Sequence, residues 1–425
     1  MAMAVSWFSL IVFEYYFERN LITTFSFAIE DPPWMPPNSG PSQALIGLHH
    51  FGDYQIWLGY AAVNNPYASF ILYPPQTPPQ TVWLFKAFLQ LGFEKFLGVP
   101  KTLLGFWIVS AISWVAGLTQ QFKESSLSKS ELRLWITLSL FSIPLIVTFD
   151  RGSLQFVVVA FCLLFVRSVT RNQRFLAALF FVIAVSLKPY CALLLLWPVS
   201  ERKWRVVFES TITFLFITII GLWRLPDSFN QSLRSLYKAL SGHVAGPDMS
   251  WLSNSVSGPA ALWKLTNITH VQALTDMFNS NSKLVLICIS LAIISAIALI
   301  VVSPVSNSVE SLIILMSGTQ LVVPLSGAYT ALWTVALIPL LLRTISDFRS
   351  NQKTKGFDSR MILCTSAFSV FALVSLLPLP GSIQVGGLTY RYAALIAPLG
   401  MTLMIFILAV VVGVETIRGF RPRQP

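Results

Sequence analysis

Long apolar segments alternate with short polar connections along most of the chain. An α-helix needs roughly 20 apolar residues to cross the hydrocarbon core of a bilayer, and these segments reach that length or approach it. The pattern therefore predicts about ten membrane-spanning helices. Their expected ranges are 4–28, 102–118, 134–148, 154–169, 206–223, 283–302, 311–324, 329–342, 361–377 and 392–414.

The apolar segment from Phe175 to Val199 departs from this pattern. Basic residues flank it on both sides, and Lys188-Pro189 interrupts its middle. A single crossing would place one basic cluster on each side of the membrane. Two half-length helices that meet at Lys188-Pro189 would keep both clusters on one side, and broken helices occur where they line a cavity. We favour such a re-entrant hairpin over a single span.

Two long segments, 29–100 and 224–282, do not have the pattern of a span because they are too polar or too rich in proline. Within the first, short helices are expected at 54–63 and 81–97. Polar residues recur at every fourth position of the second helix, which is typical of an amphipathic helix lying at a membrane interface. A strongly basic connection follows later, at 343–360.

The composition agrees with this pattern. Hydrophobic residues make up 55% of the chain and charged residues 11%, whereas soluble domains carry roughly 25% charged residues. The predicted fold class is an all-α polytopic membrane protein of one domain, residues 1–425. We expect a bundle of about ten spans plus a re-entrant hairpin, with interfacial helices in a long first outer loop.

The formal net charge of +11 comes mainly from cations in short connections between apolar segments. Cytoplasmic loops of membrane proteins carry such an excess of lysine and arginine. This distribution predicts cytoplasmic termini, a cytoplasmic loop at 343–360, and outer loops at 29–100 and 224–282 in a cell-membrane protein. Since the bilayer as a partner explains the charge, no nucleic-acid partner is expected.

Neither the cysteines nor the histidines have the spacing of a metal site or a disulfide framework. The four cysteines all lie inside apolar segments and are widely separated: Cys162, Cys191, Cys288 and Cys364. We therefore expect no metal site and no other cofactor, and a requirement for a divalent ion in solution stays open.

The predicted topology gathers one carboxylate and several cations on the outer side. Asp53 lies in the first outer loop, and the cations are Lys188, Arg151 and Arg391. A carboxylate can act as general base towards a hydroxyl, and cations stabilise the charge on a departing phosphate. Asp53 is equally suited to cap the helix expected at 54–63, and Arg151 to pair with Asp150.

The order of short motifs resembles the GT-C superfamily of glycosyltransferases, which use polyprenyl-phosphate sugars. It is most similar to family 87, the branch with actinobacterial α-mannosyl- and arabinosyltransferases. That branch has an aspartate in the first outer loop, followed by Pro-Tyr and by an aromatic-Tyr-Pro-Pro run. The matching residues are Asp53-Tyr54, Pro66-Tyr67 and Leu72-Tyr73-Pro74-Pro75.

Three further motifs extend the resemblance to about Tyr329. They are Gly152-Ser153-Leu154-Gln155, which departs from the family's Gly-Gln-x-Asn at two positions, the segment from Ala184 to Pro189 followed by Lys203-Trp204, and the run from Ser253 to Gly258. A late family motif, Pro-x-Ser-Trp-x-His, reads Pro324 to Tyr329 here, so tyrosine stands at the histidine position.

The resemblance implies a GT-C-like bundle that transfers a sugar, with mannose or arabinose expected. The donor is a polyprenyl-phosphate sugar and the acceptor an envelope glycan or glycolipid. Asp53 is the implied general base of an inverting transfer, with Asp31 as the reserve acid, and Lys188, Arg151 and Arg391 bind the donor phosphate. The residues expected to bind substrate are Tyr54, Tyr67, Tyr73, Gln155, Asn254 and Tyr329.

Two other functions remain compatible with the sequence. A transporter or flippase of a lipid-linked sugar would be expected to have related halves and paired broken helices, and this chain has one broken segment. A catalytically degenerate envelope-assembly protein is the other alternative, because Tyr329 replaces the family's histidine.

Overall fold

The computed structural model describes the following parts of the chain: residues 52–69, 75, 77–90, 95–96, 99–125, 128–140, 145, 148, 153–244, 255, 257–269, 272–304, 306, 308–323, 332–338, 364, 366, 368–369, 382–385 and 388–419. The expected first span at 4–28, the reserve acid Asp31 and the basic loop 343–360 lie outside these residues.

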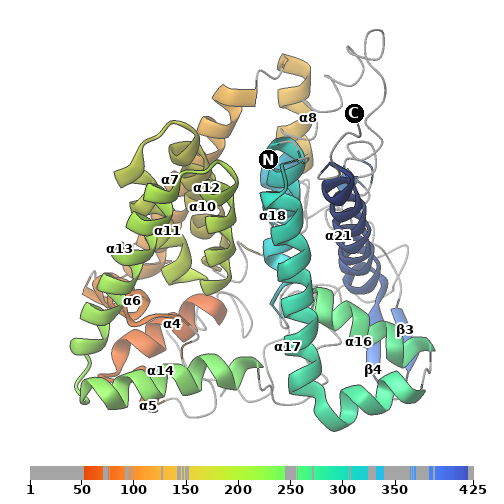
Figure 1. Cartoon of the computed structure of the whole chain (residues 1–425). Helices are drawn as coiled ribbons and strands as arrows, with labels where there is room; N and C mark the ends of the chain where they lie inside the picture. Colours follow the sequence, from red (N-terminus) through yellow and green to blue (C-terminus); the bar gives the residue numbers. More distant parts are fainter. Residues whose placement is uncertain are drawn as a thin grey trace, which may run out of the picture.

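The described chain is a helical bundle in two halves (Figure 1). The upright helices of the first half are α7 (Lys101–Ser125), α10 (Gln155–Thr170), α11 (Arg174–Leu187) and α13 (Trp204–Trp223). Helix α8 (Lys129–Leu140) lies beside the second half, where Trp135 Nε1 donates to the Val335 carbonyl oxygen at 3.1 Å (Figure 1). Those of the second half are α17 (Gln272–Val302), α18 (Ser308–Leu321) and α21 (Tyr392–Gly419). In the first half α10 packs between α7 and α11, and in the second α17 packs against both α18 and α21.

Three of the described helices contain a stretch long and apolar enough to cross a membrane: Trp204–Trp223, Leu284–Val302 and Leu395–Ile417. They coincide with spans predicted at 206–223, 283–302 and 392–414. Shorter apolar helices lie at Ile108–Gly117, Gln155–Thr170, Arg174–Leu187 and Pro189–Ser200. The chain is therefore a helical membrane protein, while the total of about ten spans and the side on which each loop lies stay predictions.

The segment predicted as a hairpin is broken at Lys188. Helix α11 ends at Leu187, Lys188 is extended, and the chain continues as the 3₁₀ helix η1 (Pro189–Leu195) and helix α12 (Leu196–Ser200). Proline cannot continue an α-helix because it lacks the N–H and clashes with the preceding turn. At 1.5 Å per α-helical and 2.0 Å per 3₁₀ residue, each limb is about 21 Å long, too short to cross a bilayer alone.

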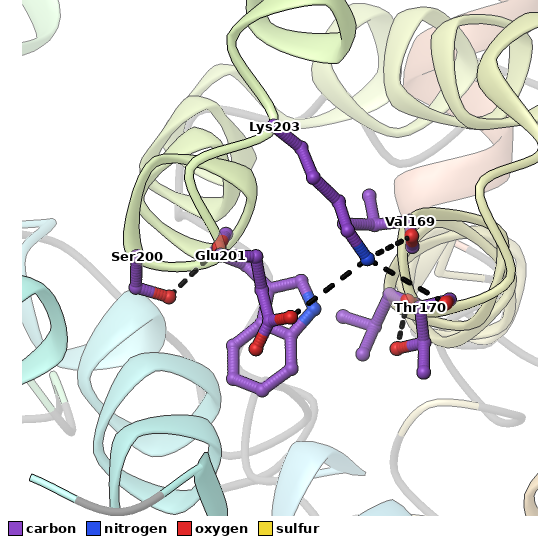
Figure 2. A network of polar contacts seen from close by, with 7 residues as sticks. Val169, Thr170, Ser200, Glu201 and Lys203 are labelled. Atoms are coloured by element: carbon purple, nitrogen blue, oxygen red, sulfur yellow. Dashed lines mark hydrogen bonds and ion pairs between the residues drawn. The ribbon is translucent and has the colours of Figure 1, made fainter.

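The two limbs return to the same end of the bundle. Lys203, just after α12, donates from Nζ to the carbonyl oxygens of Val169 (2.7 Å) and Thr170 (3.5 Å) at the end of α10 (Figure 2). Glu201 Oε2 lies 3.7 Å from the same Nζ. The basic residues on both sides of the hairpin are thus neighbours, as the sequence pattern requires. The break predicted at Lys188-Pro189 is confirmed.

At the opposite end, shorter helices gather beneath the bundle (Figure 1). They are α4 (Gly52–Ala62), α5 (Pro66–Ser69), α6 (Pro79–Gln90), α14 (Phe229–Val244) and α16 (Gly258–Thr269). They come from the two long polar segments, so these segments share one end of the molecule. The described chain also contains two antiparallel pairs of strands. They are β1 (Lys95–Phe96) with β2 (Val99–Pro100), and β3 (Ser382–Val385) with β4 (Leu388–Arg391).

The helix expected at 81–97 is shorter and more enclosed than predicted. It ends at Gln90, and residues 95–96 form strand β1 instead. Helix α6 packs against α4, α7, α11 and α13, and its Val82 and Phe85 side chains are buried. Gln90 is exposed as the spacing of polar residues predicts, but Lys86 is half-buried, and the exposed Leu84 and Ala87 lie outside that polar series.

Candidate functional site

Helix α6 is hydrogen-bonded to the tip of the re-entrant hairpin. Thr81 Oγ1 donates to the Ser186 carbonyl oxygen at 2.5 Å, and Gln80 Nε2 donates to Ser186 Oγ at 2.8 Å. Gln80 Nε2 also lies 3.1 Å from Thr218 Oγ1 on α13. These bonds hold the first polar segment directly over the last turn of α11, two residues before the half-buried Lys188.

A partly buried hydrogen bond joins the start of α10 to the same tip. The Tyr190 hydroxyl donates to Gln155 Oε1 at 3.1 Å, and Gln155 is fully buried. Gln155 Nε2 has no hydrogen-bond partner in the described part of the chain. Gln155 thus keeps an amide N–H without a described acceptor beside Tyr190, two residues after Lys188, and such donors suit phosphate or sugar oxygens.

Tyr190 was not among the residues predicted from the sequence. It follows Lys188-Pro189 by one position, but its hydroxyl reaches Gln155, which is 35 residues away. The sequence signal that could have indicated Tyr190 was the break at Lys188-Pro189. Broken helices occur where they line a cavity, so the residues next to the break are candidates for a site.

Asp53 lies in the first turn of α4, a helix attached to both α6 and α7 by aromatic contacts. Trp57 stacks on Phe85 with ring centroids 5.1 Å apart, and Tyr54 lies 5.1 Å from Phe106. Asp53 therefore belongs to a helix whose position is fixed against the end of the bundle. The described atoms do not include its side chain.

The two predicted substrate tyrosines that the structure describes are interior residues. Tyr54 is buried, and burial raises its pKa against the opposing influence of the Thr102 hydroxyl. Tyr67 is also buried, and its hydroxyl donates to the Thr77 carbonyl oxygen at 2.6 Å. Burial raises the pKa of Tyr67, with the charge on Tyr60 as a smaller cause. Both rings support the loop framework, and direct contact with substrate stays a prediction for them.

A second polar cluster lies where α16 begins. Lys264 is fully buried, and its Nζ donates to the Ser255 carbonyl oxygen at 2.5 Å. Ser255 Oγ donates to Ser257 Oγ at 3.1 Å, and Ser257 Oγ accepts from the Ala260 backbone N–H at 3.3 Å. Burial lowers the pKa of Lys264 to about 7. The hydrogen bond from Lys264 fixes the backbone at Ser255, the residue directly after Asn254.

The remaining predicted residues are described in part or lie outside the described residues. Arg391 ends strand β4, directly before α21, and its backbone alone is described. Tyr73, Arg151, Asn254 and Tyr329 lie outside the described residues, as Asp31 does. The structure thus unites Gln155, Lys188 and α6 at the hairpin tip and adds Tyr190. It leaves the distance between Asp53 and Lys188 as a prediction.

Among the described residues no group of three histidine, cysteine or acidic side chains could hold a metal ion. The four cysteines are free thiols; Cys162 and Cys191 lie with their sulfur atoms 3.7 Å apart between α10 and η1.

The comparisons with known proteins give one family. The model of glycosyltransferase family 87 matches residues 72–327, a range that contains the hairpin, Gln155, Lys188 and the α16 cluster. Asp53 lies before the matched range, and Tyr329 and Arg391 lie after it. A comparison with curated proteins returns no match.

Proposed function

Because the chain belongs to glycosyltransferase family 87, we propose that it transfers mannose or arabinose from a polyprenyl-phosphate donor to an envelope glycan or glycolipid. The transfer takes place on the outer face of the cell membrane. The observation that carries the proposal is the family match over residues 72–327, which includes the re-entrant tip with Lys188 and Gln155.

The reaction is an inverting displacement. The Asp53 carboxylate accepts the proton of an acceptor hydroxyl as its oxygen attacks the anomeric carbon from the face opposite the phosphate. The new carbon–oxygen bond forms while the anomeric carbon–phosphate oxygen bond breaks, and the polyprenyl phosphate leaves with the electron pair. Lys188, Arg151 and Arg391 stabilise the charge that develops on the phosphate.

The geometry at the hairpin tip supports this division of roles. Helix α6 connects α4, which carries Asp53, to the last turn of α11, just before Lys188, through the Thr81 and Gln80 hydrogen bonds to Ser186. A general base and a phosphate-binding cation must keep a fixed separation, because misplacement by about 1 Å costs on the order of a hundredfold in rate. Rigid docking of α6 supplies that constraint.

The decisive experiment measures transfer from a radiolabelled polyprenyl-phosphate sugar to an envelope acceptor by the purified full-length protein. We expect Asp53→Asn to abolish transfer but to keep the elution volume, the melting temperature and the donor binding of the wild type. The matched control is Asp31→Asn, which should retain transfer. Wild-type turnover by Asp53→Asn would refute the assignment, and loss of turnover only in Asp31→Asn would move the base to Asp31.

The same assay separates the proposed enzyme from its alternatives. Product formation identifies an enzyme. Movement of the lipid-linked sugar across a vesicle membrane without product identifies a transporter, and the absence of both identifies an assembly protein.

A further inference from the structure

Two cations surround one indole ring where α6 meets the end of α13. Lys86 Nζ lies 4.5 Å from the centroid of the Trp83 ring, and Arg224 Cζ lies 5.2 Å from it. Trp83 and Lys86 belong to α6, while Arg224 directly follows α13. Cation–π attraction contributes to holding both side chains on the ring.

The charges of this pair are not offset by a salt bridge to any carboxylate in the described part of the chain. Neither Lys86 nor Arg224 forms an ion pair there, and Asp227, three positions after Arg224, accepts a hydrogen bond from Asn65 instead. Since both cations lie near the same ring, their charges are within about 10 Å of each other, roughly one Debye length at 0.1 M salt. Their repulsion is therefore only partly screened, and a bound anion would relieve it.

The position of the pair along the bundle identifies the kind of anion. The membrane-spanning stretch of α13 ends at Trp223, so Arg224 is the first residue beyond it. Next to the cations, on the side of the membrane-spanning stretch, the surface is apolar and open: Trp223 is 70% exposed, and Leu84 is 43% exposed. The neighbouring residues Ile219 and Ile220 are also exposed. A ligand with a phosphate and hydrocarbon chains complements both the charges and this surface.

We propose that Trp83, Lys86 and Arg224 form a binding site for an anionic glycerophospholipid of the surrounding bilayer. Its phosphate bridges Lys86 and Arg224, and its acyl chains lie along the exposed face of α13. Two charge-assisted hydrogen bonds of about 2.8 Å to different oxygens of one phosphate connect donors up to about 8 Å apart, a span that lies within the upper bound on the separation of the two cations around the ring.

The occupant is a bilayer lipid because the site opens outward, away from the buried cluster at the hairpin tip. Arg224 is exposed and Leu84 faces the surroundings, whereas Gln155 is fully buried. Thr81 and Gln80 reach inward from α6 to Ser186. A lipid at Lys86 would thus stabilise the same helix that contacts the tip, without occupying it. The inference does not depend on the proposed transfer reaction.

The test is native mass spectrometry of the full-length protein in detergent, titrated with phosphatidylglycerol. We expect Lys86→Gln with Arg224→Gln to weaken binding about 25-fold, since each surface cation contributes about fivefold. Arg224→Gln alone should weaken it about fivefold. The matched control, Arg205→Gln with Arg234→Gln, removes the same charge from exposed positions elsewhere and should bind as the wild type does. Phosphatidylcholine should bind more weakly than phosphatidylglycerol to the wild type.

Three results would overturn the proposal. The first is unchanged phosphatidylglycerol affinity in the Lys86–Arg224 double variant, or in Arg224→Gln should the double variant not fold. The second is an equal loss in the control. The third is displacement of phosphatidylglycerol by farnesyl phosphate at equimolar concentration, which would assign the site to a prenyl phosphate.

Discussion

Lys264 is a lysine with no exposed surface, bound to the Ser255 carbonyl oxygen at the turn before α16. Its pKa of about 7, against an ordinary value of 10.5, reflects burial of its charge. Lysine is almost never fully buried without a partner. The turn that follows Asn254 therefore depends on a group whose charge is costly to bury.

This burial predicts a pH dependence of stability. Below pH 7 the folded and unfolded states both carry the proton, and the cost of the buried charge is fully present. Between pH 7 and about 10.5 the folded state releases the proton and the unfolded state keeps it, so stability rises with pH. We expect the melting temperature of the wild type to rise from pH 7 to pH 9.5 relative to Lys264→Met. Identical pH profiles for the two proteins would contradict the prediction.

Gly258 occupies the crowded junction of α16, α17, α18 and α21. A Cβ atom there would lie 2.6 Å from Ile293 Cδ1 and 2.7 Å from Thr402 Oγ1. Gly258→Ala should therefore destabilise the protein by about 1–3 kcal/mol. Gly400→Ala is the matched control, since nothing lies within 4 Å of its added Cβ and alanine favours a helix by about 1 kcal/mol. Chemical denaturation in detergent micelles compares the two, and a stabilised Gly258→Ala would disprove the packing argument.

At the scale of elements, α10 and α12 end in the same type of C-terminal cap, and Lys203 joins the two caps. Asn172 after α10 and Arg202 after α12 both adopt a left-handed backbone, with φ of 57° and 56°. The Gln173 N–H bonds to the Ser168 carbonyl, and the Lys203 N–H to the Pro198 carbonyl, which satisfies the terminal carbonyl groups of each helix. The Lys203 side chain starts at the cap of α12, and its Nζ donates to the Val169 carbonyl oxygen at the end of α10 (Figure 2).

Lys203 should therefore contribute to closing the hairpin. Lys203→Met keeps the aliphatic stem but removes the donors to Val169 and Thr170, and we expect a loss of about 1–3 kcal/mol because the hydrogen bond comes from a charged group. Arg205→Met, two positions later and exposed, is the control and should cost less than about 0.5 kcal/mol. Equal melting temperatures for both variants would show that the cross-link contributes nothing.

At the scale of the whole molecule, the re-entrant hairpin connects the two halves of the bundle. Its outgoing helix α11 packs against α10 and α13, while the returning limb of η1 and α12 packs against α17 and α18. The last turn of α11, just before Lys188, is hydrogen-bonded to α6, and α6 lies at the end where α4, α14 and α16 gather (Figure 1). The two caps that Lys203 joins lie at the other end, together with the short basic connections 171–174 and 202–205. The short basic connections on either side of the hairpin and the covering short helices thus lie at opposite ends.

This polarity predicts the orientation in the membrane. Because cations favour the cytoplasmic side, Gln173→Cys, beside Arg171 and Arg174, should react with a membrane-impermeant maleimide only after permeabilisation. Asn230→Cys on α14 should react in intact cells. Both substitutions are made in a Cys288→Ser background, since Cys288 is exposed and the other three cysteines are buried. The reverse labelling pattern would invert the topology.

The sequence alone determined the features that depend on local pattern. The length of the apolar segments predicted the helices at 206–223, 283–302 and 392–414, because the length of a span depends only on its own residues. Lys188-Pro189 predicted the break in the hairpin, because proline lacks the N–H that an α-helix needs at that position. Matched basic flanks predicted that the limbs return to one end. The motif order also pointed to family 87, which the match over 72–327 supports.

The tertiary structure alone decided which distant side chains meet. Tyr190 with Gln155, Thr81 with Ser186, and Lys86 with Arg224 are paired across large sequence separations. It also placed Tyr54 and Tyr67, which the family resemblance implied as substrate-binding residues, in the interior. Such contacts depend on how helices pack, and the hydrophobic pattern of one helix says which face is covered but not what covers it.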